Sequence, residues 1–340
     1  MTHIHPRTLI LGLLGMLTCT GIFCLGSGSC PIPMARVTAV ITSHAAGFPD
    51  PTTLPRLDQT IVWDIRLPRL LVAVSTGICL AVSGAVFQGC FRNPLVEPYI
   101  LGISSGAAFG AALGIVCPAF FMSTQVLAFG FGSLAVAMAW SMARQQGETP
   151  VAGLVLSGII TGSIFASLVG ILKYIAADTA LREIVFWLMG GFYYAGWTDA
   201  ALLLTVSGMG LVLTWAMAWR INILSLGDTQ ARSLGINPEP NKVLLIGAAT
   251  LMTATAVSCS GVIAWVGLMI PHGARMIVGP DHRVVIPVSA LLGALYLLIC
   301  DTIARTLTQA EIPIGIITSL IGAPYLFFLI RTRGRRSLGG

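Results

Sequence analysis

Charged residues are scarce in this 340-residue chain. Only 9% of its residues are Asp, Glu, Lys or Arg, whereas 56% are apolar, and the mean hydropathy is strongly positive. Soluble domains of this size do not have such a composition, so we expect a polytopic membrane protein. No stretch leaves room for a large soluble module, and we predict a single all-α transmembrane domain over residues 1–340.

The sequence also lacks the motifs that mark common catalytic sites. It has no His-Glu-x-x-His pair, no nucleophile elbow and no Gly-rich dinucleotide turn. Its only lysines, Lys173 and Lys242, lie outside any Gly-x-x-x-x-Gly-Lys-Ser/Thr loop, so the chain cannot hold ATP in the usual way. We expect no enzyme activity; uphill transport would draw its energy from an ion gradient or from another chain.

Neither the cysteines nor the net charge points to a further activity. The eight cysteines form no Cys-x-x-Cys pair and fall mostly within apolar runs. We interpret them as small buried side chains, and we expect neither a bound metal nor a disulfide framework. The net charge of +6 is explained by basic side chains in cytoplasmic loops, so we do not expect nucleic-acid binding.

Apolar runs of about twenty residues predict ten membrane spans. The runs cover residues 8–25, 70–89, 99–116, 125–143, 151–174, 200–219, 243–258, 262–277, 284–301 and 313–330. We expect the eighth run to be interrupted at Pro271. The first run resembles a signal peptide, but because further spans follow, we expect it to stay as an uncleaved helix.

Three segments between the spans are long enough to carry structure of their own. Residues 26–64 form a long loop with a short amphipathic piece at 55–65, and residues 178–192 are predicted to form a short interfacial helix. In the polar loop 220–241, Gly227 and Asp228 begin a short helix that Gly235 ends. That helix is either a solvated loop helix or a surface for a cytoplasmic partner.

Arginine and lysine predict how the chain is oriented. Ten spans put both termini on one side of the membrane. That side carries Arg7, Arg92, Arg144, Arg220, Arg232, Lys242, Arg283 and the arginine-rich tail. The opposite side carries Arg36, Arg56, Arg66, Arg69, Lys173, Arg182 and Arg305, offset by seven acids. The first side is richer in basic residues, so both termini are expected in the cytoplasm and residues 26–64 outside.

The stretch from residue 66 to residue 114 is predicted to be a helical hairpin with two unusual features. Arg66 and Arg69 stand at the mouth of its first span, where a charge is costly unless it has a use. Four glycines recur every fourth residue in its second span and mark a seam of close helix packing. They are Gly102, Gly106, Gly110 and Gly114.

A single-chain, ion-coupled secondary transporter is the alternative hypothesis. Ion coupling needs ionisable groups deep in the bilayer, and the candidates are Glu97, Asp301, His272 and Arg275. All four can also be read as groups near the interface. The one hint of a broken helix is the segment that ends at Pro271-His272.

Ten short motifs between residues 63 and 329 together resemble the permease subunits of ABC importers for iron–siderophores, haem and cobalamin. The motifs are Arg66-Leu-Pro-Arg69, Ser83-Gly-Ala-Val-Phe-Gln88, Asn93-Pro-Leu-Val-Glu-Pro98, Leu101-Gly-Ile-Ser-Ser-Gly106, Trp187-Leu-Met-Gly-Gly191, Gly227-Asp-Thr-Gln-Ala-Arg-Ser-Leu-Gly235, Gly267-Leu-Met-Ile-Pro-His272, Asp281-His-Arg283, Asp301-Thr-Ile-Ala-Arg305 and Glu311-Ile-Pro-Ile-Gly315. Each motif is weak alone, and their order makes the set specific.

The resemblance implies a type II importer fold with ten helices per subunit, in a bacterial or archaeal cytoplasmic (inner) membrane. It implies a second permease subunit, identical or paralogous, two cytoplasmic ATPase subunits that carry ATP and Mg, and an extracytoplasmic substrate-binding protein. No cofactor is implied for this chain itself. The substrate is expected to be a metal chelate, an iron–siderophore or haem first and cobalamin next.

The resemblance also implies site residues. Arg66, Arg69 and Arg305 fall on positions that receive acidic residues of the binding protein, a role that suits the fixed fork of arginine. The ATPase-coupling segment comprises Leu226, Gly227, Asp228, Thr229, Gln230, Ala231, Arg232, Ser233, Leu234 and Gly235. The translocation path would be lined by Ser157, Gly158, Thr161, Gly162 and Phe165.

Two parts of the resemblance are left open. Helix packing is the alternative explanation for the small residues of the fifth span. In a cobalamin member of the family, small hydroxyl residues just before this span form the cytoplasmic gate. Here residues 150–152 do not match that pattern and Thr149 lies just outside it, so we assign no gate residue.

Overall fold

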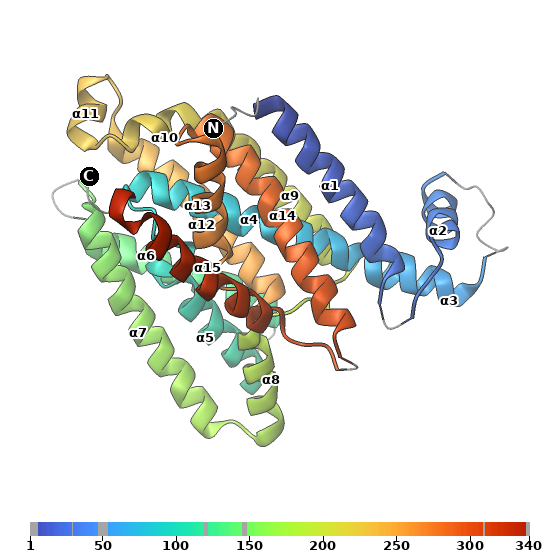
Figure 1. The fold of residues 1–340 in the computed structure, drawn as a ribbon. Coiled ribbons are helices and arrows are strands. Elements are labelled where there is room, and N and C mark those ends of the chain that lie inside the picture. The colour runs from blue at the N-terminus through green and yellow to red at the C-terminus, as the bar shows by residue number, and fades with distance from the viewer. Residues whose placement is uncertain are drawn as a thin grey trace.

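The computed structural model describes residues 6–28, 30–46, 54–118, 122–144, 148–308 and 310–337, and these residues fold into helices joined by short turns (Figure 1). The elements are α1 (Pro6–Gly26), α2 (Met34–Ala46), α3 (Arg56–Gln59), η2 (Thr60–Arg66), α4 (Leu67–Phe91), η3 (Pro98–Leu101), α5 (Ile103–Val116), α6 (Thr124–Ala143), α7 (Val151–Ile175), α8 (Asp178–Met189), α9 (Trp197–Ala216), α10 (Ala218–Leu224), α11 (Asp228–Ser233), α12 (Pro238–Ser260), α13 (Val266–Val278), α14 (His282–Thr306) and α15 (Ile314–Ser337). The predicted all-α membrane fold is confirmed.

Seven of the described helical stretches are long and apolar enough to cross a membrane. Six of them are the single helices α1, α6, α7, α9, α12 and α14. The seventh is the continuous run Arg56–Phe91, which comprises α3, η2 and α4. Three shorter apolar helices, Ile103–Val116, Val266–Val278 and Ile314–Phe328, coincide with the other predicted spans. The number of ten spans stays a prediction, because α5 with 14 residues and α13 with 13 fall below the usual spanning length, although α15 as a whole has 24.

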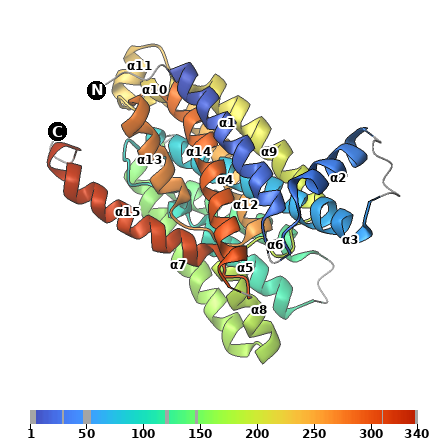
Figure 2. The same cartoon turned by 45° about the vertical axis from the view of Figure 1, so that its right-hand side comes forward.

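Helix α4 is the centre of the molecule. It is apolar all round and lies between α9, α12, α13 and α14, which bury nearly all of it (Figures 1 and 2). Close backbone approach makes this packing possible: a Cβ added at Gly77 would overlap the carbonyl of Gly293 on α14, and one at Gly84 that of Gly267 on α13. Together with α4, these four helices form the centre of the fold.

A second group of helices, α5, α6 and α7, lies beside this centre. Of the four predicted seam glycines, Gly106 and Gly110 meet backbone carbonyls of α6, and Gly114 meets Thr124 at its start. Gly102 instead precedes α5 with a φ of +80° and approaches Gly158 and Gly162 of α7. The glycines thus bring α5 against two neighbours.

The 26–64 loop contains a helix that its composition did not indicate. Helix α2 is stabilised by tertiary contacts, since Val37 and Val40 pack with Leu25, Ile32 and Val62 in a small separate core. The amphipathic piece predicted at 55–65 is also helical, and it continues without a break into α4 through a π-helical stretch. Figure 1 shows α2 and α3 projecting from one side of the bundle.

The expected interruption at Pro271 is wrong. Helix α13 runs through Pro271, and the break precedes it, at residues 261–265, where Trp265 has a left-handed φ of +75°. A proline removes the N–H that would bond to the carbonyl four residues earlier, here Gly267. The side-chain amide of Gln88 donates to that carbonyl at 3.3 Å and to the carbonyl of Leu268 at 3.1 Å, so the helix tolerates the proline.

The two predicted functional ends lie at opposite ends of α4. Arg66 is the residue before its first turn, and Arg92 ends it in a left-handed conformation. Arg92 in turn lies against Gly227, just before α11. A helix of 25 residues separates these points by about 37 Å.

Candidate functional site

Three arginines and two carboxylates form a cluster, here called the arginine cluster, at the start of α4. The Arg69 guanidinium donates to Asp301 at 2.9 Å and to Glu311 at 2.8 Å. Arg305, one turn after Asp301 on α14, lies 3.2 Å from the same carboxylate. The side chain of Asp301 is 2% exposed and that of Arg69 is 9% exposed, so these charges are buried as a mutually neutralising group.

Arg66 is held differently from the other two arginines. Its guanidinium donates to the backbone carbonyls of Leu25 at 2.7 Å and Cys30 at 2.6 Å. Arg305 makes similar bonds to the carbonyls of Cys24 and Ser27. The last turn of α1 and the segment that follows it therefore contact both guanidinium groups, and among the described residues Arg66 forms no salt bridge.

All three arginines are buried in the single chain, and their role in docking the binding protein stays a prediction. Arg66, Arg69 and Arg305 are at most 9% exposed, because a buried guanidinium needs partners and the chain supplies them. The sequence held one usable signal, the i,i+4 spacing of Asp301 and Arg305 on one helix. The carbonyl contacts of Arg66 had no signal in the sequence.

At the opposite end of α4, the predicted coupling segment forms a short exposed helix. Gly227 precedes α11 with a φ of +122°, and Gly235 follows it with a φ of +78°, conformations that favour glycine. Asp228 pairs with the buried Lys242 of α12 at 2.7 Å. The outer surface carries Leu226, Thr229, Gln230, Arg232, Ser233 and Leu234.

Further polar contacts tie this end together. Arg232 of α11 lies 2.6 Å from Glu148, whose carboxylate raises the pKa of the guanidinium. In the turn before α14, Asp281 accepts hydrogen bonds from Arg283 and from Asn222 of α10. These bonds, that of Arg283 first, lower the pKa of Asp281 to about 2. The α10–α11 segment is thus joined to α12, to α14 and to the chain before α7.

The residues predicted to line the path face the interior of the chain. Ser157, Thr161 and Phe165 are at most 6% exposed. Gly158 meets the Ile100 carbonyl, and Gly162 lies beside Gly102. These contacts agree with the alternative of helix packing, and a role in lining the path stays a prediction. The uncovered face of α7 is aliphatic and carries Leu156, Ile159, Ile160 and Ile164.

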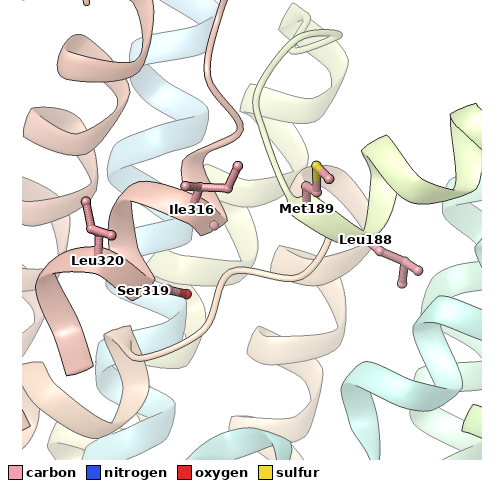
Figure 3. Close-up of a pocket in the computed structure, with 6 residues that line it drawn as sticks. Leu188, Met189, Ile316, Ser319 and Leu320 are labelled. Atoms are coloured by element: carbon pink, nitrogen blue, oxygen red, sulfur yellow. The ribbon is translucent and has the colours of Figure 1, made fainter.

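An apolar pocket of about 480 Å³ lies between the end of α8 and the start of α15. Its lining residues are Leu188, Met189, Gly315, Ile316, Ser319 and Leu320 (Figure 3). The two helices meet there through glycine, since Gly315 approaches the Met189 carbonyl and Ile314 donates to the Gly190 carbonyl at 3.0 Å. The pocket has no charged lining residue, and Ser319 is the one polar side chain among those that line it.

The four candidates for ion coupling do not gather in one place. Asp301 belongs to the arginine cluster, whereas Glu97 follows the opposite end of α4. Arg275 of α13 lies 3.4 Å from the carbonyl of Pro271. Within the described part of the chain, no group of three or more His, Cys, Asp or Glu side chains is arranged to hold a metal ion.

Comparison with known proteins assigns the family. The model of the FecCD transport family matches residues 16–332. The cobalamin import system permease protein BtuC of Halobacterium salinarum is 40% identical over 92% of this chain and 82% of its own length. The molybdate import system permease protein MolB of Haemophilus influenzae is 37% identical over 96% of both chains, and the hemin transport system permease protein HmuU of Yersinia pestis is 43% identical over 81% and 85%.

Solved structures agree with this assignment. A metal-chelate type ABC transporter in an inward-facing conformation superposes with a TM-score of 0.84 at 36% identity, covering 96% of this chain and 99% of the other. PsaBC of Streptococcus pneumoniae has a TM-score of 0.59 at 21% identity and covers 83% and 98%, which supports the fold alone. The predicted resemblance is confirmed: this chain is a multi-span membrane permease of the ABC-importer type and belongs to the FecCD transport family.

Proposed function

We propose that the chain is the permease subunit of an ATP-driven importer for a metal chelate, an iron–siderophore or haem first and cobalamin next. The observation that carries the proposal is the arrangement at the two ends of α4, with the arginine cluster at one end and the exposed helix α11 at the other. Related permeases are named for cobalamin, hemin and molybdate, which share a metal centre but not a shape. Cargo selection therefore belongs mainly to the binding protein.

The energy for transport would come from two cytoplasmic ATPase subunits. The sequence has no phosphate-binding loop, and α11 offers exposed leucines on both sides of a polar helix, a surface that a partner can grip. Leu226 to Gly235 are proposed as the contact region. A rigid helix at this place can pass a rigid-body movement of the ATPases to the membrane helices.

A second permease subunit, identical or paralogous, would complete the path. The aliphatic face of α7 is uncovered in the single chain, as are Ile316 and Leu320 of α15 beside the pocket. We assign these surfaces to the partner subunit and to the path, which Ser157, Gly158, Thr161, Gly162 and Phe165 are also proposed to line. An uncharged wall suits a bulky chelate, because it offers no fixed charge that would bind the chelate tightly.

The binding protein is proposed to dock at the end that carries the arginine cluster. Arg66 is the best placed of the three to receive one of its carboxylates, because its present partners are neutral carbonyls. A carboxylate makes a stronger, charge-assisted bond to a guanidinium. Arg69 and Arg305 already pair with Asp301, and they would stabilise the docking surface without contacting the binding protein.

Reconstitution in vesicles tests the proposal. The chain would be reconstituted together with its ATPase and binding protein. Uptake of a ferric siderophore, haem, cobalamin and molybdate would each be measured with and without ATP and Mg²⁺ on the side of the membrane where the ATPase is bound. We expect uptake of one chelate that stops when ATP or Mg²⁺ is withdrawn. Uptake that needs no ATPase and follows an imposed proton or sodium gradient would reject the proposal in favour of an ion-coupled carrier.

A further inference from the structure

At the α11 end of the molecule, two side chains on the first turns of α12, Glu239 and Lys242, contact two other parts of the chain. Lys242 contacts α11, and Glu239 contacts the residue that precedes Pro150 and α7. Lys242 pairs with Asp228 of α11 at 2.7 Å, and its own side chain is only 2% exposed. A buried ammonium is tolerated only while it is paired, and removal of its partner leaves an uncompensated charge. Lys242 therefore fixes α11 to the first turns of α12.

Glu239 lies three residues before Lys242 and holds the chain on the other side. One carboxylate oxygen accepts from the backbone N–H of Thr149 at 3.0 Å, and the other accepts from its hydroxyl at 3.0 Å. Thr149 is 1% exposed. Two bonds from one carboxylate to one residue set both the position and the orientation of that residue.

Thr149 connects directly to α7. The next residue is Pro150, at a φ of −61°, and α7 begins at Val151. Because the proline ring fixes this φ, the joint between Thr149 and the first turn of α7 has little freedom. A displacement of Thr149 is therefore passed to the helix whose opposite face is proposed to border the path.

A third link in the same place is much weaker. Arg232 and Glu148 lie 2.6 Å apart, but their side chains are 52% and 61% exposed. Exposed ion pairs contribute little because water and salt screen them. The buried links through Lys242 and Glu239 therefore dominate.

From these contacts we infer that Glu239 is a positioning residue that makes the start of α7 move together with α11 and α12. The inference rests on the proposed function, because it assumes that the ATPases act through α11. In this arrangement α11, the first turns of α12 and the residues before α7 form one body. Movement imposed on α11 then reaches the path without any direct contact between α11 and α7.

The test compares four variants in the reconstituted importer. Glu239→Ala removes both acceptors, Thr149→Val removes only the hydroxyl, Glu239→Gln keeps one acceptor oxygen, and Glu148→Gln alters only the exposed pair. We expect uptake per ATP hydrolysed to fall about tenfold in Glu239→Ala, less in Thr149→Val and Glu239→Gln, and not at all in Glu148→Gln. ATPase binding and ATP hydrolysis should persist in all four. Unchanged uptake per ATP in both Glu239→Ala and Thr149→Val would overturn the inference, and so would loss of ATPase binding in step with uptake.

A distance measurement on the permease alone separates this inference from the proposed function. In a background where the native cysteines are replaced by Ser, spin labels at Ala152→Cys on α7 and Ser233→Cys on α11 should give one narrow distance, which broadens in Glu239→Ala and is kept in Glu148→Gln. A distance distribution that Glu239→Ala leaves unchanged would contradict the positioning role of Glu239, even if no cargo is transported. If the unmodified chain shows no ATP-driven uptake but the labels behave as expected, the proposed function is rejected and the positioning role of Glu239 is supported.

Discussion

Asp301 is the residue on which the arginine cluster depends, because Arg69 and Arg305 both pair with it. Two of the three arginines, Arg69 and Arg305, share two carboxylates, and the second carboxylate, Glu311, is about one third exposed. The charges of these two arginines are therefore balanced only when the buried carboxylate is ionised.

Replacement of Asp301 by Asn should destabilise the folded chain by about 3–5 kcal/mol, the usual cost of leaving a buried charge without its partner. Thermal unfolding of the purified permease in lipid nanodiscs measures this loss. Glu148→Gln is the matched control, since it removes the carboxylate from a pair in which Arg232 is 52% and Glu148 61% exposed, and it should cost far less because water and salt screen such a pair. Equal losses in the two variants would show that the cluster contributes no more than a surface pair.

Single residues also show which features could be predicted from the sequence and which could not. Gly227 and Gly235 were expected to bound a short helix, and they do so because their backbone conformations favour glycine. Arg66 and Arg69 were recognised as unusual, but their burial depends on residues up to 242 positions away. Local chemistry was readable, whereas the partners of a side chain across the fold were not.

At the scale of helices, apolar runs predicted nearly every membrane segment because the lipid itself selects them by length. Helix α2 was missed because its stability comes from contacts with Leu25 and Val62, and the break before α13 was misplaced because Gln88 replaces the bond that Pro271 removes. Both differences arise where tertiary contacts overrule a local preference.

The role of Gln88 can be tested by pairing it with Pro271. Gln88→Leu should cost about 1–3 kcal/mol, because it leaves the buried Gly267 carbonyl without a partner. Pro271→Ala restores a backbone N–H for that carbonyl, so Gln88→Leu should cost clearly less in this background. A double-mutant cycle of unfolding free energies measures the coupling. Additive effects of the two substitutions would contradict this account of how α13 tolerates its proline.

For the molecule as a whole, the feature that organises function is the separation of its two ends. Helix α4 and the helical run before it extend unbroken over 36 residues, and α2 and α3 lie away from α11 in both views of the fold (Figure 2). The family resemblance assigns one end to a binding protein and the other to ATPases. That assignment requires the two ends to face different compartments.

Labelling from each side of the membrane checks this requirement. In a background where the native cysteines are replaced by Ser, single cysteines would be introduced by Arg56→Cys beside α3 and Ser233→Cys on α11, both at exposed positions. A membrane-impermeant maleimide should label position 56 in intact right-side-out vesicles and position 233 only after permeabilisation. Labelling of both positions from one side would place the two ends together and reject the importer.

The pairing of Arg69 has a consequence for how the chain is made. Its partners, Asp301 and Glu311, come 232 and 242 residues later, so ribosomes complete most of the polypeptide before either carboxylate exists. Until then, the nascent helix carries an unmatched cation near its first turn, which water at the headgroup level can solvate. The first large hairpin can therefore reach its final packing only after one of the last helices has been made. We expect nascent chains that stop before residue 301 to be bound by membrane chaperones and degraded by membrane proteases.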